Sequence, residues 1–155
     1  MHIHRYERVW MTFGIAILII FMATIFVAAF ADNINPPTGS QTIDPTKVSS
    51  TPPFNHPGLH RNDDGTYDAY YVAQVFSFTP HTLTVPVGST VKFYVTSADV
   101  AHGFEIARTD VNIMAIPGWV NSGSHTFTEP GTYLLVCNEY CGIGHQNMYG
   151  SIEVK

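Results

Sequence analysis

Residues 70–78 read Tyr-Tyr-Val-Ala-Gln-Val-Phe-Ser-Phe, and this stretch decides the fold class. Successive side chains of a strand point to opposite faces, and both sets are largely apolar here, which is typical of a strand covered on both sides. Turn sequences such as Pro86-Val87-Gly88 and Glu129-Pro130-Gly131 separate further short segments of the same kind. About seven short strands with such turns predict an all-β fold, a small antiparallel sandwich or barrel. The further expected strands are 82–85, 91–96, 103–106, 124–127, 132–137 and 151–154.

A different pattern precedes the β region. Residues 9–31 contain no charged side chain, and a helix of that length crosses a hydrocarbon core of about 30 Å. A secretory signal peptide is the alternative, because Ala29-Phe30-Ala31 has the form of a cleavage site. The apolar region of a signal peptide is usually only about 7–15 residues long, however. We therefore expect an uncleaved transmembrane anchor over residues 1–31.

Charges beside this apolar segment predict its orientation. Arg5 and Arg8 precede the segment, whereas Asp32 follows it and the next basic residue is Lys47. Basic residues favour the cytoplasmic side of a membrane span. We therefore expect a single-pass protein of the plasma membrane, with its amino terminus in the cytoplasm and the rest of the chain outside.

Composition bounds the remaining chain. Residues 32–64 contain six prolines among Ser, Thr, Asn and Gly, which predicts an extended linker and leaves residues 65–155 for the β domain. The whole chain of 155 residues suffices for one domain, and a net charge of −5 with 45% hydrophobic residues argues against disorder. Its seven Lys and Arg residues form no cluster beyond the first pair, so no nucleic-acid partner is expected.

Cysteine, histidine and methionine gather near the carboxyl end. Residues 137–148 read Cys-Asn-Glu-Tyr-Cys-Gly-Ile-Gly-His-Gln-Asn-Met. Thiolate, thioether and imidazole are ligands that copper favours. His102 follows the expected strand 91–96, and a sandwich can bring that strand end against the carboxyl-terminal loop. The pattern predicts a copper site made of His102, Cys137, Cys141, His145 and Met148.

Other kinds of site explain these residues less well. Two cysteines outside the cytoplasm most often form a disulfide, but a disulfide leaves the histidines and the methionine without a role. A catalytic zinc site keeps an open position and has no use for a methionine. A nucleophilic Cys–His pair needs only one cysteine. Met114 is expected in the core, and ordinary polar roles are expected for His56, His60, His81 and His125.

Residues 99–104, the block 137–148 and the single amino-terminal helix together carry a family resemblance. The chain resembles subunit II of haem–copper cytochrome c oxidases, most closely the short form found in bacterial and archaeal ba3-type (B-family) enzymes. The resemblance implies a cupredoxin-like Greek-key β-sandwich that carries a dinuclear copper A centre, with the two cysteine thiolates bridging two copper ions. The implied ligands are His102, Cys137, Glu139 through its backbone carbonyl, Cys141, His145 and Met148.

The resemblance also implies a function. A site saturated by protein ligands suits electron transfer rather than bond-making. The subunit would accept electrons from cytochrome c outside the membrane and pass them to haem in subunit I, where oxygen reduction and proton translocation occur. The aromatic residue of the family's docking face would correspond to Phe76 or Phe78. Glu139 stands where ba3-type relatives often have Gln, which leaves open whether its side chain binds a second metal.

Three other functions stay open at this point. The chain could be a membrane-anchored copper carrier or storage protein that acts without an oxidase. It could be the copper subunit of a related nitric oxide reductase. It could also be a metal-free sandwich with a structural disulfide. The subunit of quinol oxidases that has lost its copper is not a match, because all the side-chain ligands are present.

Overall fold

The computed structural model describes residues 4–30 and 38–155. The chain divides into two compact units, Met1–Pro36 and Pro37–Lys155. The first contains the helix α1 (Arg5–Phe30), which is long and apolar enough to cross a membrane. None of its described residues is buried, and its apolar side chains are not confined to one face. A helix that is apolar all round suits a lipid environment or the interior of a larger assembly.

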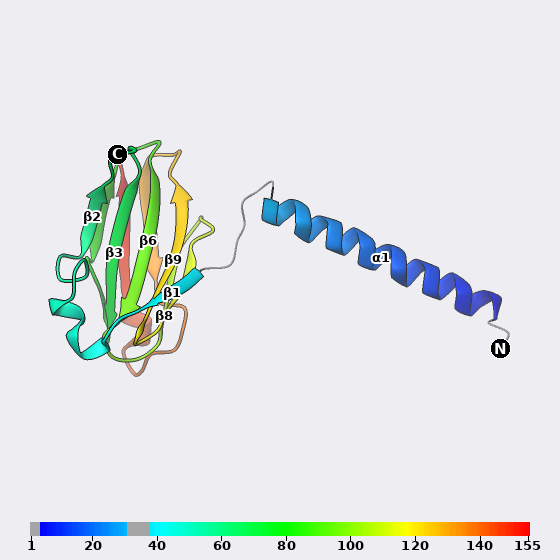
Figure 1. Ribbon diagram of the computed structural model, residues 1–155, viewed down its shortest axis with the longest axis horizontal. Coiled ribbons are helices and arrows are strands. Elements are labelled where there is room, and N and C mark those ends of the chain that lie inside the picture. The colour runs from blue at the N-terminus through cyan, green and yellow to red at the C-terminus, as the bar shows by residue number, and fades with distance from the viewer. Residues whose placement is uncertain (1–3, 31–37) are drawn as a thin grey trace. The chain divides into compact units, whose positions relative to one another are not determined.

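The second unit is a sandwich of two β-sheets. Figure 1 looks onto the larger sheet, in which β2, β3, β6 and β9 lie side by side. This sheet has six strands in the order β1-β9-β6-β3-β2, with β4 paired to β3. The strands are β1 (Thr38–Thr42), β2 (Gly58–Arg61), β3 (Tyr67–Gln74), β4 (Ser77–Thr79), β6 (Thr90–Ser97) and β9 (Trp119–Thr126).

The smaller sheet has five strands in the order β5-β11-β10-β7-β8. Two short 3-10 helices, η1 (Pro45–Ser50) and η2 (His145–Asn147), lie in connections between strands. The strands of this sheet are β5 (Thr82–Val85), β7 (His102–Ile106), β8 (Asn112–Ala115), β10 (Gly131–Val136) and β11 (Tyr149–Val154).

Two strand pairs are parallel, which differs from the antiparallel sandwich that the sequence predicts. β3 runs parallel to β6, and β5 runs parallel to β11. The chain leaves the larger sheet after β4 and enters the smaller one at β5, so neighbours within a sheet are often distant in sequence. Alternation of apolar residues has the same period in both kinds of pair, so it cannot distinguish them.

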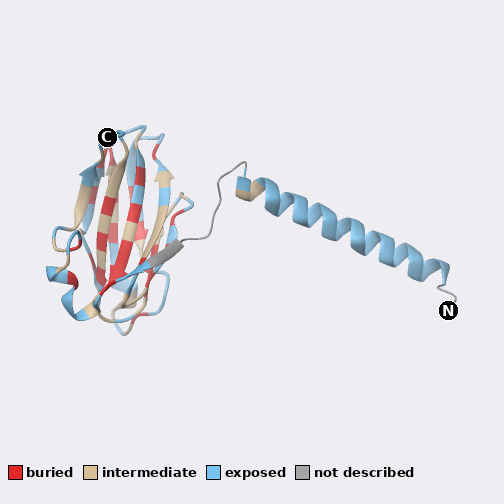
Figure 2. Ribbon diagram, in the orientation of Figure 1, coloured by how far each residue is buried: buried red, intermediate tan, exposed pale blue. Residues whose placement is uncertain are grey.

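The core between the sheets follows from this alternation. Along β3, Ala69, Tyr71 and Ala73 are fully buried, and β6 shows the same spacing of buried residues (Figure 2). The opposite face of β3 is also partly covered, because Tyr70 and Val72 pack against a smaller apolar cluster. Strand β3 is therefore covered on both sides, as its sequence predicts.

That smaller cluster comes mostly from the region predicted to be a linker. The structure differs from the prediction over residues 38–61, because β1 pairs with β9 and β2 pairs with β3. Between these strands, Ile43, Val48 and Phe54 are buried against the larger sheet. The prolines hide this participation because they interrupt any regular hydrophobic period. The first part of the predicted linker, residues 32–37, lies outside the described residues.

Replacing Phe93 by Ala tests the core. Phe93 is fully buried on β6, and its ring lies 5.9 Å from that of Phe104 and 6.2 Å from that of Phe127. Loss of the ring leaves a cavity, so we expect the free energy of unfolding to fall by about 3–5 kcal/mol. Urea denaturation of metal-free residues 32–155 measures it. The control is Val87→Ala, at a site that is 45% exposed, for which we expect a change of less than about 0.5 kcal/mol. Equal losses in the two variants would contradict the prediction.

Candidate metal centre

The loop between β10 and β11 carries most of the predicted ligands. Val136 at the end of β10 pairs with Tyr149 at the start of β11. The next pair of residues, at the two ends of the loop, is also joined. The Cys137 amide donates a hydrogen bond of 3.2 Å to the Met148 carbonyl. The loop therefore leaves and rejoins the sheet at one point, and its first and last residues lie side by side and buried.

Three sulfur atoms face one another inside this loop. The Sγ atoms of Cys137 and Cys141 are 3.8 Å apart, and both cysteines are free thiols. A disulfide bond would be about 2.05 Å long, so the alternative of a structural disulfide does not fit this geometry. Sγ of Cys141 is also 3.7 Å from Sδ of Met148.

Two imidazole rings and one carbonyl group surround the sulfurs. Nδ1 of His102 lies 4.0 Å from Sγ of Cys137, and Nδ1 of His145 lies 3.6 Å from Sγ of Cys141. The carbonyl oxygen of Glu139 lies 3.1 Å from Sγ of Cys137. The structure therefore brings together the five residues that the sequence pattern predicts as ligands and the Glu139 carbonyl that the family resemblance implies.

This donor set fits copper. Ligand atoms of His102, Cys137 and Cys141 lie within 4.8 Å of one another, and all three residues are buried. Thiolates, thioether and imidazole in one small volume form a soft to borderline set, which copper prefers. Burial and the neighbouring Cys137 raise the pKa of the Cys141 thiol to about 11. Metal binding therefore has to displace a proton from this thiol.

Asp99 contacts the candidate site, and the sequence analysis did not single it out. Its Oδ1 accepts a hydrogen bond of 2.8 Å from Nε2 of His102, and its Oδ2 accepts one of 2.7 Å from the Val75 amide. Burial raises the pKa of Asp99, but these hydrogen bonds outweigh it and hold the pKa below its usual value. The side chain is therefore a carboxylate at neutral pH. An Asp three residues before a ligand His is the signal that could have revealed it.

Asn138 fixes the first turn of the ligand loop. Its Nδ2 donates hydrogen bonds of 2.8 Å to Glu105 and 3.1 Å to Asn112. Its side chain lies directly against Gly103, because a Cβ atom added to Gly103 would be 1.7 Å from Oδ1 of Asn138. Glycine at 103 therefore lets the loop approach the strand that begins with His102.

The two phenylalanines predicted at a docking face differ in exposure. Phe78 is only 2% exposed and packs edge-on against Phe104, so it belongs to the core and is not available for docking. Phe76 is partly buried, and its ring lies on the ligand loop. A Cβ atom added to Gly144 would be 2.4 Å from Cδ2 of Phe76. The absence of a side chain at Gly144 therefore makes room for this ring.

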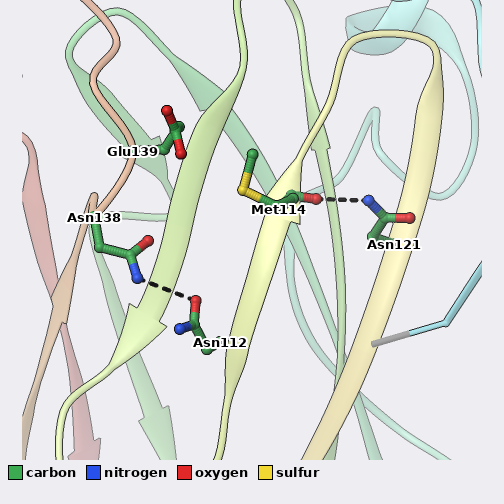
Figure 3. Close-up of a pocket in the computed structure, with 5 residues that line it drawn as sticks. All are labelled: Asn112, Met114, Asn121, Asn138 and Glu139. Carbon is green, nitrogen blue, oxygen red and sulfur yellow. Dashed lines mark hydrogen bonds between the residues drawn. The ribbon is translucent and has the colours of Figure 1, made fainter. Parts of the chain in front are cut away.

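The side chain of Glu139 faces a different space from its carbonyl group. It lines a pocket of about 460 Å³ together with Met114 and three asparagines (Figure 3). Asn138 donates to Asn112, and Asn121 donates to the Met114 carbonyl in this wall. Met114 is 39% exposed here, so its predicted place in the core is wrong. Its neighbours Ile113 and Ala115 on β8 are buried, and alternation along the strand turns Met114 to the outer face.

Comparison with known proteins shows the family of this chain. Residues 69–155 match the family model described as cytochrome c oxidase subunit II, periplasmic domain. The chain belongs to this family. A cytochrome c oxidase subunit 2 of Thermus thermophilus is 37% identical over 154 residues, which are 97% of this chain and 92% of that relative.

Solved structures extend the comparison to the fold. A chain from the cryo-EM structure of a haem–copper terminal oxidase dimer has a TM-score of 0.80 and 32% identity, over 97% of this chain and 100% of that one. The periplasmic domain of oxidase subunit II (CoxB) of Bradyrhizobium japonicum has a TM-score of 0.53 and 24% identity, over 57% and 83%. The second likeness concerns the fold alone. The predicted cupredoxin-like β-sandwich with one apolar amino-terminal helix is confirmed.

Replacing Glu139 by Gln separates the two groups of this residue. The backbone carbonyl beside Cys137 is unchanged, and Gln keeps the size of the side chain in the pocket. We expect copper content and the visible spectrum of copper-loaded residues 32–155 to match those of the unaltered protein. Metal analysis and absorption spectroscopy measure both. Loss of the spectrum would show instead that the carboxylate itself supports the centre.

Proposed function

We propose that this chain is the electron-transfer subunit of a terminal cytochrome c oxidase and that it binds two copper ions. One observation carries this proposal: two buried thiols 3.8 Å apart with one imidazole Nδ1 beside each of them. A mononuclear copper site needs only one cysteine, whereas two cysteines at this separation suit two bridging thiolates. Membership of the subunit II family supports the same conclusion.

The positions of the remaining donors support a division into two sets. In each proposed set, one terminal ligand lies beside each sulfur. His102 lies beside Cys137, and Met148 lies beside Cys141. The second set pairs the Glu139 carbonyl, beside Cys137, with His145, beside Cys141. Bridging thiolates would complete both sets equally.

The residues around these donors favour electron transfer over bond-making. Two copper ions bound here would supply a one-electron carrier. Protein groups fill all the proposed ligand positions, so the chain leaves no place for a substrate. The hydrogen bond from Cys137 to Met148 and the buried position of both residues restrict movement of the ligands. A rigid ligand set changes little when its charge changes by one.

The surface beside His145 suits contact with redox partners. Tyr140 is 75% exposed, and its ring lies 5.8 Å from that of His145. Ile143 is 89% exposed on the same loop. Exposed aromatic and aliphatic side chains favour close apolar contact between proteins. We propose that cytochrome c docks near these residues and Phe76, and that haem in subunit I receives the electrons for oxygen reduction and proton translocation.

The proposed membrane arrangement rests on α1. The helix would lie in the lipid bilayer of the plasma membrane, with Arg5 and Arg8 on the cytoplasmic side. The metal centre would then lie outside the cytoplasm, in a domain of a family described as periplasmic. An uncleaved anchor over residues 1–31 would keep this domain at the membrane beside the other oxidase subunits.

Copper loading of residues 32–155 tests the metal stoichiometry. We expect two copper ions per chain and a mixed-valence spectrum. Cys141→Ser removes a ligand shared by both ions, so it should abolish that spectrum. Met148→Leu removes one weak thioether ligand and keeps a similar volume, so it should retain two copper ions with a shifted reduction potential. Metal analysis and electron paramagnetic resonance measure these results. One copper per unaltered chain would contradict the proposal, and equal loss of copper in both variants would contradict the ranking.

Salt dependence tests the electron donor. Eleven of the 12 acidic residues and five of the 7 basic residues follow residue 31, so this part of the chain has a formal charge of −6. Such a charge attracts a basic cytochrome c and raises the rate of encounter. We expect oxidation of a basic cytochrome c by the copper-loaded protein, followed by stopped-flow absorbance, to slow as salt rises to about 0.15 M, where the screening length is roughly 8 Å.

The control is an acidic cytochrome c, whose oxidation should not slow with salt. A rate for the basic donor that ignores ionic strength would argue for apolar docking without electrostatic attraction.

A further inference from the structure

We propose that Asp99 is a positioning residue for both halves of the metal centre. One oxygen of its carboxylate orients His102, and the other holds the segment that presses Phe76 onto the ligand loop. This inference rests on the proposed copper centre and adds a residue that acts on the ligands without being one.

The first half concerns His102. Its ring is fully buried, so no water can substitute for a missing hydrogen-bond partner. Nε2 donates its proton to Oδ1 of Asp99 at 2.8 Å, which leaves Nδ1 unprotonated and turned toward Sγ of Cys137, 4.0 Å away. A carboxylate behind a ligand histidine fixes both the tautomer and the orientation of the ring. Asp99 therefore selects Nδ1 as the metal-binding atom.

The second half concerns Phe76. The Val75 amide, between β3 and β4, donates to Oδ2 of Asp99 at 2.7 Å. Phe76 is the next residue, and its ring lies against Gly142 and Gly144. Because neighbouring residues cannot move independently, the hydrogen bond at Val75 also holds this ring on the loop. That loop contains the ligands Cys141 and His145.

Asp99 is itself held by its surroundings. Its Oδ1 also accepts a hydrogen bond from the Val100 amide at 2.6 Å. Oγ of the buried Ser97 lies 3.3 Å from the same oxygen but donates its single proton to the Val100 carbonyl. The Asp99 amide donates back to Oγ of Ser97 at 3.2 Å. Two donors, His102 Nε2 and the Val100 amide, therefore meet at Oδ1 and one, the Val75 amide, at Oδ2, so both oxygens of the side chain have to be acceptors.

This asymmetry allows the two halves to be separated. Asp99→Asn can keep an oxygen toward His102 and Val100, but it then turns an NH₂ group toward the Val75 amide, and two donors repel. Asp99→Ala removes both the hydrogen bond to His102 and the one to the Val75 amide. The matched control is Asp110→Ala, because Asp110 makes the same kind of contact, 2.6 Å from Nδ1 of His125, which lies outside the ligand set.

The first experiment uses the full-length, metal-free chain in detergent. Nuclear magnetic resonance of histidine side chains should show a slowly exchanging Nε2 proton on His102 in the unaltered protein, in Asp99→Asn and in Asp110→Ala. The signal should be lost in Asp99→Ala. Reaction of Cys141 with a thiol reagent should be faster in both Asp99 variants than in Asp110→Ala, because the Phe76 ring no longer holds the loop.

The second experiment measures copper affinity by competition with a chelator. Loss of a hydrogen-bond partner of a ligand typically costs about 10- to 100-fold in metal affinity. We expect a loss of that size in Asp99→Ala, a smaller loss in Asp99→Asn, and unchanged affinity in Asp110→Ala.

The outcomes divide clearly. An Asp99→Ala protein with the His102 proton signal and copper affinity of the unaltered chain overturns the His102 half. If Asp99→Ala does not fold, an Asp99→Asn protein with unaltered affinity and thiol reactivity overturns the inference. Failure of the unaltered chain to bind two copper ions would refute the proposed function instead, and the metal-free measurements would still decide the role of Asp99.

Discussion

The closure of the ligand loop on the β10–β11 pair is the constraint on which the centre depends. The hydrogen bond from the Cys137 amide to the Met148 carbonyl continues the ladder of the two strands by one step and then stops. It places a thiol and a thioether side by side at the end of a fully paired sheet. The remaining donors of the loop need only fold back over this fixed base. The paired strands β10 and β11 therefore restrict the movement of the ligand loop.

The chemistry of the site was predictable from the sequence, because ligand identity depends on residue type and spacing. All-β architecture was predictable for the same kind of reason. The direction of β3 relative to β6 was not, since both directions give the same alternation. The burial of Phe54 in the smaller apolar cluster was not predictable either, because the prolines around it interrupt any regular hydrophobic pattern. Family resemblance named Phe76 and Phe78 together, but the chain turns between β3 and β4, which ends the regular alternation and leaves only Phe78 in the core.

Residues that contact the proposed ligands were harder to predict from the sequence than the ligands themselves. Asp99 and Asn138 act through hydrogen bonds to groups distant in sequence, such as the Val75 amide and the Glu105 carboxylate. No short motif contains both partners of such a bond. The larger sheet and the ligand loop of the smaller sheet meet instead where Phe76, between β3 and β4, lies against Gly142 and Gly144. The centre is thus supported by both layers of the sandwich, although all its proposed ligands come from β7 and the β10–β11 loop of the smaller sheet.

The contact between Phe76 and Gly144 has a consequence for sequence variation. The ring occupies the volume into which any side chain at position 144 would project. A larger residue at 144 is therefore tolerated only together with a smaller one at 76, and each single change alone creates either a clash or a void. The two positions are therefore sterically coupled. In an alignment of relatives they should vary together, although 68 positions separate them in the chain.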